Sequence, residues 1–298
     1  MHLKTLLAGL SLRSATADME TEITRISYDS RTTAPGDVFV AMTGFAADGH
    51  AYIGKAMAAG AAAVVCERPP EDSSVPYVLV ENSRRALAVM AANYYGHPAD
   101  SMTMVAVTGT NGKTTTTYLL KAILEQELGA KVGLIGTNQD LIGDEVVPTE
   151  RTTPESLELQ ELFARMRSAG CTHVVMEASS HALALDRVYG IHYAVGIFTN
   201  LTQDHLDFHK TMEAYCDAKA ILFQNCDVGV CNADDPWTER LLQNATCRRY
   251  LYAEHAAADL RAENILLAAD HIAFDAVTKD GRTPIKVGIP GGFMVYNT

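Results

Sequence analysis

A glycine-containing loop that ends in lysine and threonine is the feature of this sequence most closely tied to a definite chemistry. The run Gly109 to Thr115 reads Gly-Thr-Asn-Gly-Lys-Thr-Thr. It follows a β-prone apolar segment, Met102 to Val107, and precedes a helical pattern that begins at Tyr118. A strand, a glycine loop and a helix N-terminus together make a phosphate cradle, because backbone N–H groups and the positive helix end face the anion. The sequence therefore predicts a nucleoside triphosphate site.

Each position of this loop has a predicted part in holding the triphosphate. Glycine lets the backbone approach the phosphates closely, Lys113 can reach the β- and γ-phosphates, and the Thr114 hydroxyl can hold Mg²⁺. The pattern is the short form Gly-x-x-Gly-Lys-Thr, because Val107 stands where a standard Walker A loop has glycine. An ordinary glycine turn before a helix is the alternative. The ATP-binding positions that we expect are Gly109, Thr110, Asn111, Gly112, Lys113, Thr114 and Thr115.

Two further polar groups follow apolar strand patterns. Glu177 ends the run Thr172-His173-Val174-Val175-Met176-Glu177, and a carboxylate near Thr114 is a natural Mg²⁺ ligand. The alternative is a carboxylate at a solvated strand end. The segment 199–209 follows another strand and holds His205 and His209 together with two aspartates. An aspartate that only caps a helix is the alternative there.

Lys219 lies in an otherwise apolar helical stretch, residues 215–223. Such a lysine commonly extends its charge to solvent along an apolar surface. It could instead be desolvated, with a lowered pKa that leaves an uncharged amine. An uncharged amine can add carbon dioxide and become a carbamate, which would turn a cation into an oxygen ligand for magnesium.

Composition narrows the class of protein. The chain has 298 residues, 48% of them hydrophobic, and a formal net charge of −12. This length allows two domains, and the acidic balance argues against a nucleic-acid partner. No apolar run reaches membrane-spanning length, so we expect no membrane contact. The six cysteines form no Cys-x-x-Cys pair, which favours free thiols in a reducing cytoplasm.

The order of predicted elements indicates an α/β fold with two domains. Residues 1–98 form a small N-terminal α/β domain, in which Ser83 is the expected cap of a helix that ends near Tyr95. Residues 99–298 alternate strands and helices, which implies a mostly parallel sheet covered by helices on both faces. Thr153 is the candidate cap of the second helix, and residues 272–289 suggest an antiparallel flank. The strands predicted for this domain are 102–108, 131–136, 172–178, 194–199 and 228–232, and the helices are 112–128, 154–169 and 211–224.

These motifs, taken together, resemble the Mur ligase family, the ATP-dependent amide-forming enzymes of peptidoglycan synthesis. Within the family the chain is most similar to the MurE branch, because of its Ser-Ser-His and Gln-Asp-His-Leu-Asp-Phe-His runs. The N-terminal motifs also occur in the MurF branch and do not separate the two. The matching stretches are 28–31, 36–41, 48–50, 109–115, 152–155, 176–181, 186–188, 199–209 and Lys219.

The resemblance implies a role for each matching position. Ser30 should contact the UDP part of a sugar nucleotide, while Thr152, Thr153, Ser179 and Arg187 should hold its muramoyl-peptide and phosphates. Thr114 and Glu177 should hold one Mg²⁺. A second Mg²⁺ should lie among Glu177, His205 and carbamylated Lys219, with His209 in support and His181 in a structural role. Asn297 ends the run 293–297, which resembles an adenine-binding Phe-Asn-x-x-Asn motif with Met294 in place of the first asparagine. With Lys113, the expected catalytic set is Lys113, Glu177, His205 and Lys219.

The resemblance implies a cytoplasmic, monomeric ligase that adds diaminopimelate or lysine to UDP-MurNAc-L-Ala-D-Glu. ATP would convert the acceptor carboxylate to an acyl phosphate, which the amine of the incoming amino acid attacks. We also expect a C-terminal truncation, because family members carry a third domain that selects the amino acid, and this piece should be poorly active alone. The alternatives are a MurF-like ligase, a folylpolyglutamate-synthase-like ligase, and a fragment that only binds its ligands.

Overall fold

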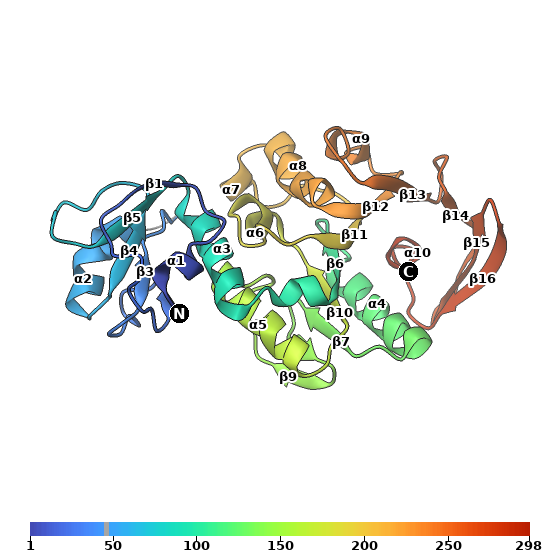
Figure 1. Cartoon of the computed structure of the whole chain (residues 1–298). Helices are drawn as coiled ribbons and strands as arrows, with labels where there is room; N and C mark the ends of the chain where they lie inside the picture. The colour runs from blue at the N-terminus through green and yellow to red at the C-terminus, as the bar shows by residue number, and fades with distance from the viewer. Residues whose placement is uncertain (45–47) are drawn as a thin grey trace. The chain divides into compact units, whose positions relative to one another are not determined.

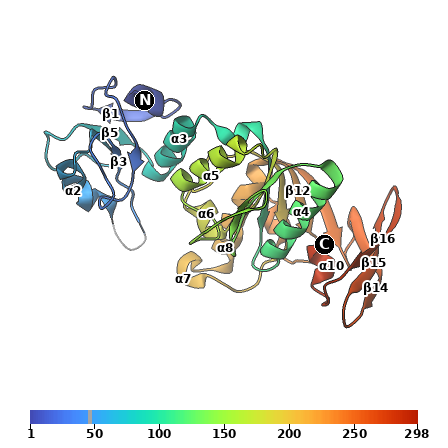
Figure 2. The ribbon, with the colours of Figure 1, turned by 90° about the horizontal axis from the view of Figure 1, so that it is seen from below.

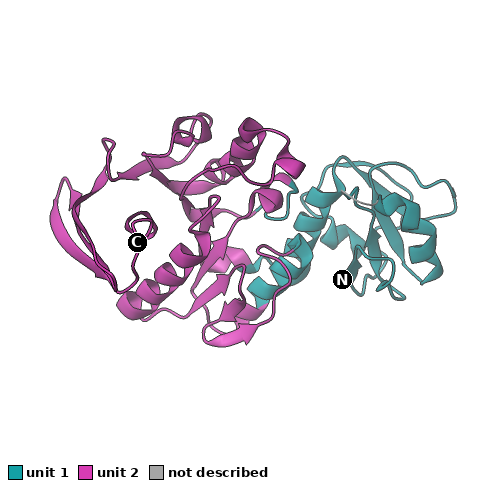
Figure 3. Cartoon of the chain, turned by 180° about the vertical axis from the view of Figure 1, so that it is seen from behind, with its two compact units in different colours: residues 1–98, 155–164, 185–190 teal, residues 99–154, 165–184, 191–298 magenta. Residues whose placement is uncertain are grey.

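The computed structural model describes residues 1–44 and 48–298, which divide into two compact units (Figures 1 and 3). Unit 1 comprises Met1–Pro98, Glu155–Ala164 and Leu185–Gly190. Unit 2 comprises Ala99–Pro154, Arg165–Ala184 and Ile191–Thr298. Two short segments of the later sequence therefore pack with the N-terminal part of the chain.

Unit 1 is built on a five-stranded sheet of order β1-β5-β4-β3-β2. Strands β2 to β5 run parallel, and β1 pairs with β5 in the antiparallel sense. The parallel strands are short and apolar on both faces, as expected where each face is covered. Its elements are α1 (Leu3–Leu6), β1 (Leu12–Ala15), β2 (Ile26–Ser27), β3 (Val38–Val40), the 3₁₀ helix η1 (Gly49–Tyr52), α2 (Ile53–Ala58), β4 (Ala63–Cys66), β5 (Tyr77–Val80) and α3 (Ser83–Tyr95).

The start of α3 corrects one prediction. Ser83 is the first helical residue, and the cap is Asn82, whose side chain accepts hydrogen bonds from the backbone N–H groups of Arg84 and Arg85. Asn82 has extended backbone geometry, which suits a cap residue, and asparagine caps at least as well as serine. The helix ends at Tyr95, and its C-cap Gly96 adopts the left-handed conformation (φ 68°) that favours glycine.

Unit 2 contains an eleven-stranded sheet of order β16-β15-β14-β13-β12-β11-β6-β10-β7-β8-β9. Figure 2 shows the strands β14, β15 and β16 side by side at one end of it. Pairs from β7 across to β14 are parallel, and the pairs at both ends are antiparallel. The predicted α/β class and the antiparallel flank are confirmed. The strands are β6 (Thr103–Thr108), β7 (Val132–Ile135), β8 (Asp140–Ile142), β9 (Glu145–Val147), β10 (His173–Glu177), β11 (Tyr193–Phe198), β12 (Cys226–Asn232), β13 (Arg248–Ala253), β14 (Leu260–Leu267), β15 (Ile272–Thr278) and β16 (Gly281–Val287).

The helices differ from the predicted ranges mainly at their ends. The helix α5 begins at Ser156, so Thr153 does not cap it and instead bonds to the end of β10. None of the helices in the described ranges is long and apolar enough to cross a membrane. The helices not yet given are the 3₁₀ helix η2 (Pro98–Ser101), α4 (Lys113–Leu128), α5 (Ser156–Ser168), α6 (Ser180–Ala184), α7 (Leu206–His209), α8 (Met212–Ala220), the 3₁₀ helix η3 (Ile221–Gln224), α9 (Thr238–Leu241) and α10 (Met294–Asn297).

The register of the three central strands sets the position of the polar loops. Glu177 at the end of β10 pairs with Val107 of β6, and Phe198 at the end of β11 pairs with Thr108. All three strands are parallel, so their carboxyl ends meet at one edge of the sheet. In open α/β sheets this edge is where ligands bind.

Asp140 of β8 gives a test of the packing at the β7-β8-β9 end of this sheet. Its side chain is 3% exposed, and burial raises the pKa of its carboxyl group to about 6. The folded state then binds a proton more tightly than the unfolded chain, so stability falls as pH rises from about 4 to about 6. We expect Asp140→Asn to raise the free energy of unfolding at pH 7.5 by on the order of 1 kcal/mol.

This gain should shrink when denaturant unfolding is repeated near pH 4.5. The control is Asp144→Asn, which changes an exposed residue of the β8–β9 turn and should have little effect at either pH. An equal loss of stability at both pH values would show instead that hydrogen bonds to the Asp140 carboxylate, such as that from the Gly136 N–H, outweigh its desolvation.

Candidate functional site

The loop between β6 and α4 has the geometry of a phosphate cradle. Gly109 (φ 151°) and Gly112 (φ 88°) both adopt backbone conformations that side chains disfavour. A Cβ on Gly109 would overlap Thr199 Oγ1, so glycine is required there for the loop to lie against the end of β11. Gly112 is the N-cap of α4 and offers no side-chain acceptor, which leaves the helix end available to an anion.

The end of β11 fixes the loop through hydrogen bonds. Thr199 Oγ1 donates to the Asn111 carbonyl at 2.7 Å. The Asn111 N–H donates to Asn200 Oδ1 at 3.0 Å, and the Thr110 N–H donates to the Asn200 carbonyl at 2.8 Å. The cradle is therefore preorganised by residues almost ninety positions away in the sequence.

Two lysines converge on the same carbonyl group of the loop. Lys113 Nζ donates to the carbonyls of Gly109 at 2.9 Å and Thr110 at 3.0 Å. Lys219 Nζ, from α8, donates to the Gly109 carbonyl at 2.8 Å. Lys219 is 1% exposed, and burial, reinforced by the charge of Lys113, lowers its pKa well below the ordinary lysine value. Burial also lowers the pKa of Lys113, a shift that the carboxylates of Glu177 and Asp204 oppose.

Glu177 lies fully buried at the end of β10, beside the same loop. Its Oε1 accepts hydrogen bonds from Thr114 Oγ1 at 2.8 Å and from the Thr137 N–H at 3.0 Å. Its Oε2 accepts one from Thr137 Oγ1 at 3.0 Å. A hydroxyl and a carboxylate side by side form the oxygen donor set that Mg²⁺ prefers, so these two residues fit the predicted ion.

The histidine predicted as a metal ligand lies in an aromatic cluster. His205 (φ 52°) is half-exposed, and its ring centroid lies 4.9 Å from that of His181 and 6.1 Å from that of Tyr215. His209 is buried, with Nε2 2.9 Å from Ser180 Oγ, and burial lowers its pKa to about 4. Among the described residues, no three His, Cys, Asp or Glu side chains are grouped as a metal site. The second predicted magnesium site, which includes Lys219, stays a prediction.

Three residues predicted to hold the substrate lie beside Glu177 in unit 2. Thr153 Oγ1 donates to the Glu177 carbonyl at 2.8 Å and accepts from the Ser179 N–H at 3.2 Å. The hydroxyls of Thr152 and Thr137 lie 3.0 Å apart. A set of hydroxyl groups therefore continues from the predicted magnesium ligands.

The other two predicted substrate residues belong to unit 1. Ser30 is buried just after β2. Arg187 Nε lies 2.8 Å from Glu155 Oε1 within the same unit. Their assignment to the substrate stays a prediction.

Residues that the sequence reasoning missed appear in a cavity beside the loop. The cavity has a volume of about 480 Å³ and is bounded by Gly112 and by Asn297, the predicted adenine contact. The segment that follows β12 completes the cavity. The sequence signal that could have identified it is the polar run 232–235, which stands at the end of a strand like the other polar motifs. Asp234 accepts the Tyr296 hydroxyl at 3.1 Å, and Asp235 accepts the Leu201 N–H at 2.7 Å. Asn200 belongs to the predicted polar segment 199–209, and the missed lining residues are Asn232, Asp234, Asp235 and Pro236.

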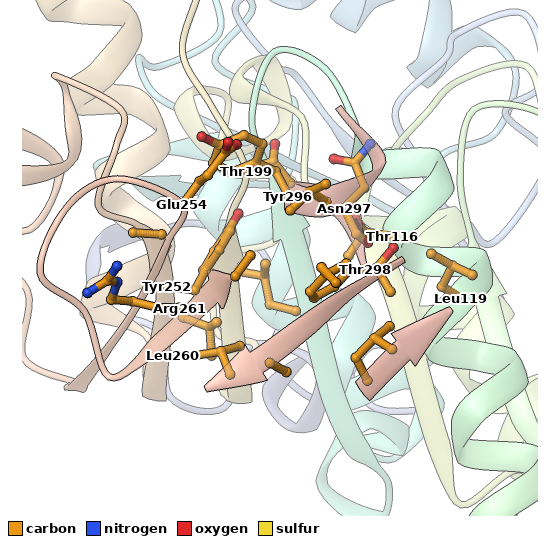
Figure 4. A pocket seen from close by; sticks show the side chains of 18 of the residues that line it. Thr116, Leu119, Thr199, Tyr252, Glu254, Leu260, Arg261, Tyr296, Asn297 and Thr298 are labelled. Atoms are coloured by element: carbon orange, nitrogen blue, oxygen red, sulfur yellow. Dashed lines mark hydrogen bonds between the residues drawn. The ribbon is translucent and has the colours of Figure 1, made fainter. Parts of the chain in front are cut away.

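A second cavity of about 430 Å³ shares Tyr296 and Asn297 with the first (Figure 4). Most of its lining is apolar and comes from α4, β11 and the antiparallel strands, with Leu119 and Leu260 among the labelled side chains. None of the loop residues 109–115 lines this cavity, whereas Asn111, Gly112 and Thr115 line the first one. The nucleotide is therefore expected in the polar cavity.

Comparison with known proteins agrees with this geometry. Residues 107–298 match the Mur ligase middle domain, and residues 22–95 match the Mur ligase family catalytic domain. The UDP-N-acetylmuramoyl-L-alanyl-D-glutamate–2,6-diaminopimelate ligase of Clostridium botulinum is 46% identical over 301 aligned positions, which cover all of this chain and 62% of that protein. The chain thus spans about three-fifths of this relative's length.

Solved structures extend the comparison to the fold. A structure of a ligase with the same printed name superposes with a TM-score of 0.83 at 25% identity, over all of this chain and 61% of that one. MurF from Acinetobacter baumannii gives a TM-score of 0.61 at 23% identity, over 92% of this chain and 57% of that one, which reflects the fold alone. With both domain matches and the phosphate cradle in agreement, the chain belongs to the Mur ligase family.

Proposed function

We propose that this chain provides the sugar-nucleotide-binding and ATP-binding parts of a MurE-type ligase that extends UDP-MurNAc-L-Ala-D-Glu by one amino acid. The observation that carries the proposal is the pair formed by Thr114 and Glu177 beside Lys113 at the carboxyl edge of the sheet. The similarity to a diaminopimelate-adding ligase makes diaminopimelate the first amino acid to test, with lysine second.

The reaction that we propose joins two anions in its first step. An oxygen of the acceptor carboxylate attacks the γ-phosphorus of ATP, ADP leaves, and an acyl phosphate forms. The amine of the incoming amino acid then attacks the acyl carbon, and inorganic phosphate leaves as the amide bond forms. Cations must offset the charge repulsion of the first step.

The residues around the loop are suited to that demand. Lys113 is held by two loop carbonyls and can exchange them for phosphate oxygens. Thr114 and Glu177 would hold Mg²⁺, which supplies positive charge between the phosphates. A carbamate on Lys219 would give an oxygen ligand for the second magnesium site predicted with Glu177 and His205, and the burial and lowered pKa of Lys219 favour the uncharged amine that this requires. Thr153 and Ser179, which are hydrogen-bonded to each other beside Glu177, would orient the acceptor.

Ligand preference separates the MurE-type assignment from its alternatives. In calorimetric titrations we expect the chain to bind UDP-MurNAc-L-Ala-D-Glu in preference to the UDP-MurNAc-tripeptide. A preference for the tripeptide would move the assignment to a MurF-like ligase. Binding of neither nucleotide, with ATP binding intact, would favour a folylpolyglutamate-synthase-like enzyme. Tight binding of the dipeptide form without turnover would identify a binding-only fragment.

Lys113 provides the test of the phosphate cradle. Replacing it with methionine removes a charge-assisted contact to phosphate, so we expect a non-hydrolysable ATP analogue to bind about 10- to 100-fold more weakly. The matched control is Lys286→Met, at an exposed position of β16, which should leave the dissociation constant unchanged. Equal affinities for the wild type and the Lys113 variant would remove this lysine from the nucleotide site.

Gly136 provides the test of the magnesium pair. A Cβ at this position would lie 2.6 Å from Glu177 Oε1, so alanine should displace the carboxylate while the backbone stays in place. In the wild type, MgCl₂ should raise the affinity for the non-hydrolysable ATP analogue above its value in EDTA. We expect this increase to be roughly tenfold smaller in Gly136→Ala. Gly288→Ala is the control, because a Cβ there enters open space. An unchanged magnesium effect in the Gly136 variant would exclude Glu177 as a ligand.

A further inference from the structure

Unit 1 contains a cluster of one carboxylate and two arginines. Glu155 precedes α5 and is 9% exposed, Arg84 lies in the first turn of α3, and Arg187 lies in the segment 185–190. Arg187 Nε lies 2.8 Å from Glu155 Oε1, whereas Arg84 Nη1 lies 3.6 Å from Glu155 Oε2. The two guanidinium side chains are 15% and 16% exposed. Both charges are thus largely withdrawn from water while one carboxylate separates them.

The guanidinium of Arg84 is incompletely satisfied. Its Nε donates to the Thr43 carbonyl at 3.3 Å, but its Nη1 is buried and has no hydrogen-bond partner among the described residues. The distance to Glu155 is too long for a hydrogen bond. A buried charged donor without an acceptor is costly, so such a group in a native fold calls for an explanation.

Neighbouring acids already have other partners. Asp186 accepts Arg85 Nε at 3.1 Å and Asn82 Nδ2 at 3.2 Å. Glu67 accepts both the N–H and the hydroxyl of Ser83 at 2.8 Å. These contacts distinguish Arg84 from Arg85, which is half-exposed and has a carboxylate of its own.

We infer that Arg84 and Arg187 form an oxyanion-binding pair, and that Glu155 holds the two guanidinium groups until the anion arrives. The ligand chemistry is a phosphate or carboxylate oxygen of the sugar-nucleotide substrate, so the inference rests on the proposed function. Arginine presents a fork of N–H donors suited to such oxygens. Arg187 was expected at the substrate from the sequence, whereas Arg84 gave no sequence signal beyond its place at a helix start.

The cluster could instead only tie α3 to its neighbours, and the two roles differ in their readouts. A structural tie predicts a lower unfolding temperature for an Arg84 variant without any ligand. If the pair is an oxyanion site, removal of Arg84 still leaves the close pair of Glu155 and Arg187. The midpoint temperature of thermal unfolding without ligand should then change by no more than a few degrees. The loss should appear in the affinity for anionic ligands.

The experiment compares Arg84→Gln, Arg84→Lys and the control Arg85→Gln in calorimetric titrations of the whole chain. The ligands are uridine, UDP and UDP-MurNAc-L-Ala-D-Glu. We expect Arg84→Gln to weaken binding of at least one anionic ligand by about tenfold or more, and Arg84→Lys to recover part of that loss. Uridine binding and the Arg85 variant should stay within about twofold of the wild type. A loss that already appears with UDP assigns the pair to the diphosphate, and one confined to the dipeptide form assigns it to a carboxylate.

Other outcomes overturn the inference. Wild-type affinity of Arg84→Gln for both anionic ligands would exclude the pair and leave the proposed function standing. A lowered midpoint temperature of unfolding, together with equal losses of affinity for all three ligands, would show a structural tie. If Arg84→Gln does not fold, Arg84→Lys carries the test, because it keeps the charge and loses the fork, and unchanged binding would then exclude the site. A folded wild-type chain that binds neither anionic ligand would refute both the inference and the proposed function.

Discussion

The carbonyl oxygen of Gly109 is the point on which the arrangement of the site depends. It accepts hydrogen bonds from Lys113 in the first turn of α4 and from Lys219 in α8, and it does so from a loop that only glycine can form. Two ammonium groups that share one acceptor repel each other, which is one reason why the pKa of Lys219 is low. The close approach of Gly109 to Thr199 therefore sets the shape of the loop, while burial and the neighbouring Lys113 charge lower the pKa of the Lys219 amine.

Strand register explains why these groups meet at all. The cradle follows β6, Glu177 ends β10, and Thr199 follows β11, and parallel pairing brings the three strand ends to one edge. The sequence was sufficient to predict this edge, because each polar group directly follows an apolar run of strand length. The alternation of strands and helices in residues 99–298 likewise predicted the sheet and its antiparallel flank, which the structure confirms.

What the sequence could not provide were contacts between distant polar groups. Asn82 rather than Ser83 caps α3. The two residue types have similar cap propensity, so only the backbone geometry of the folded chain shows which of them is the cap. Thr153 suited a helix cap by pattern, but its hydroxyl bonds to the end of β10 instead. The tie between Asp234 and the hydroxyl of Tyr296 joins positions 62 residues apart, and no periodicity encodes it. Such side-chain hydrogen bonds follow from tertiary packing, which local propensity does not determine.

The hydrogen bond between Asp234 and the Tyr296 hydroxyl also lies at the boundary between the two cavities. Asp234 accepts three backbone N–H groups, from Glu254, His255 and Ala256, in addition to the Tyr296 hydroxyl. A carboxylate with this many donors is held rigidly, and it fixes the ring of Tyr296 where the polar and apolar cavities meet. Asn297, the next residue, then reaches Gly112 of the cradle, where a Cβ would overlap its side-chain oxygen. The second loop glycine thus makes room for α10, which packs against the antiparallel flank, at a position that the predicted phosphate cradle also uses.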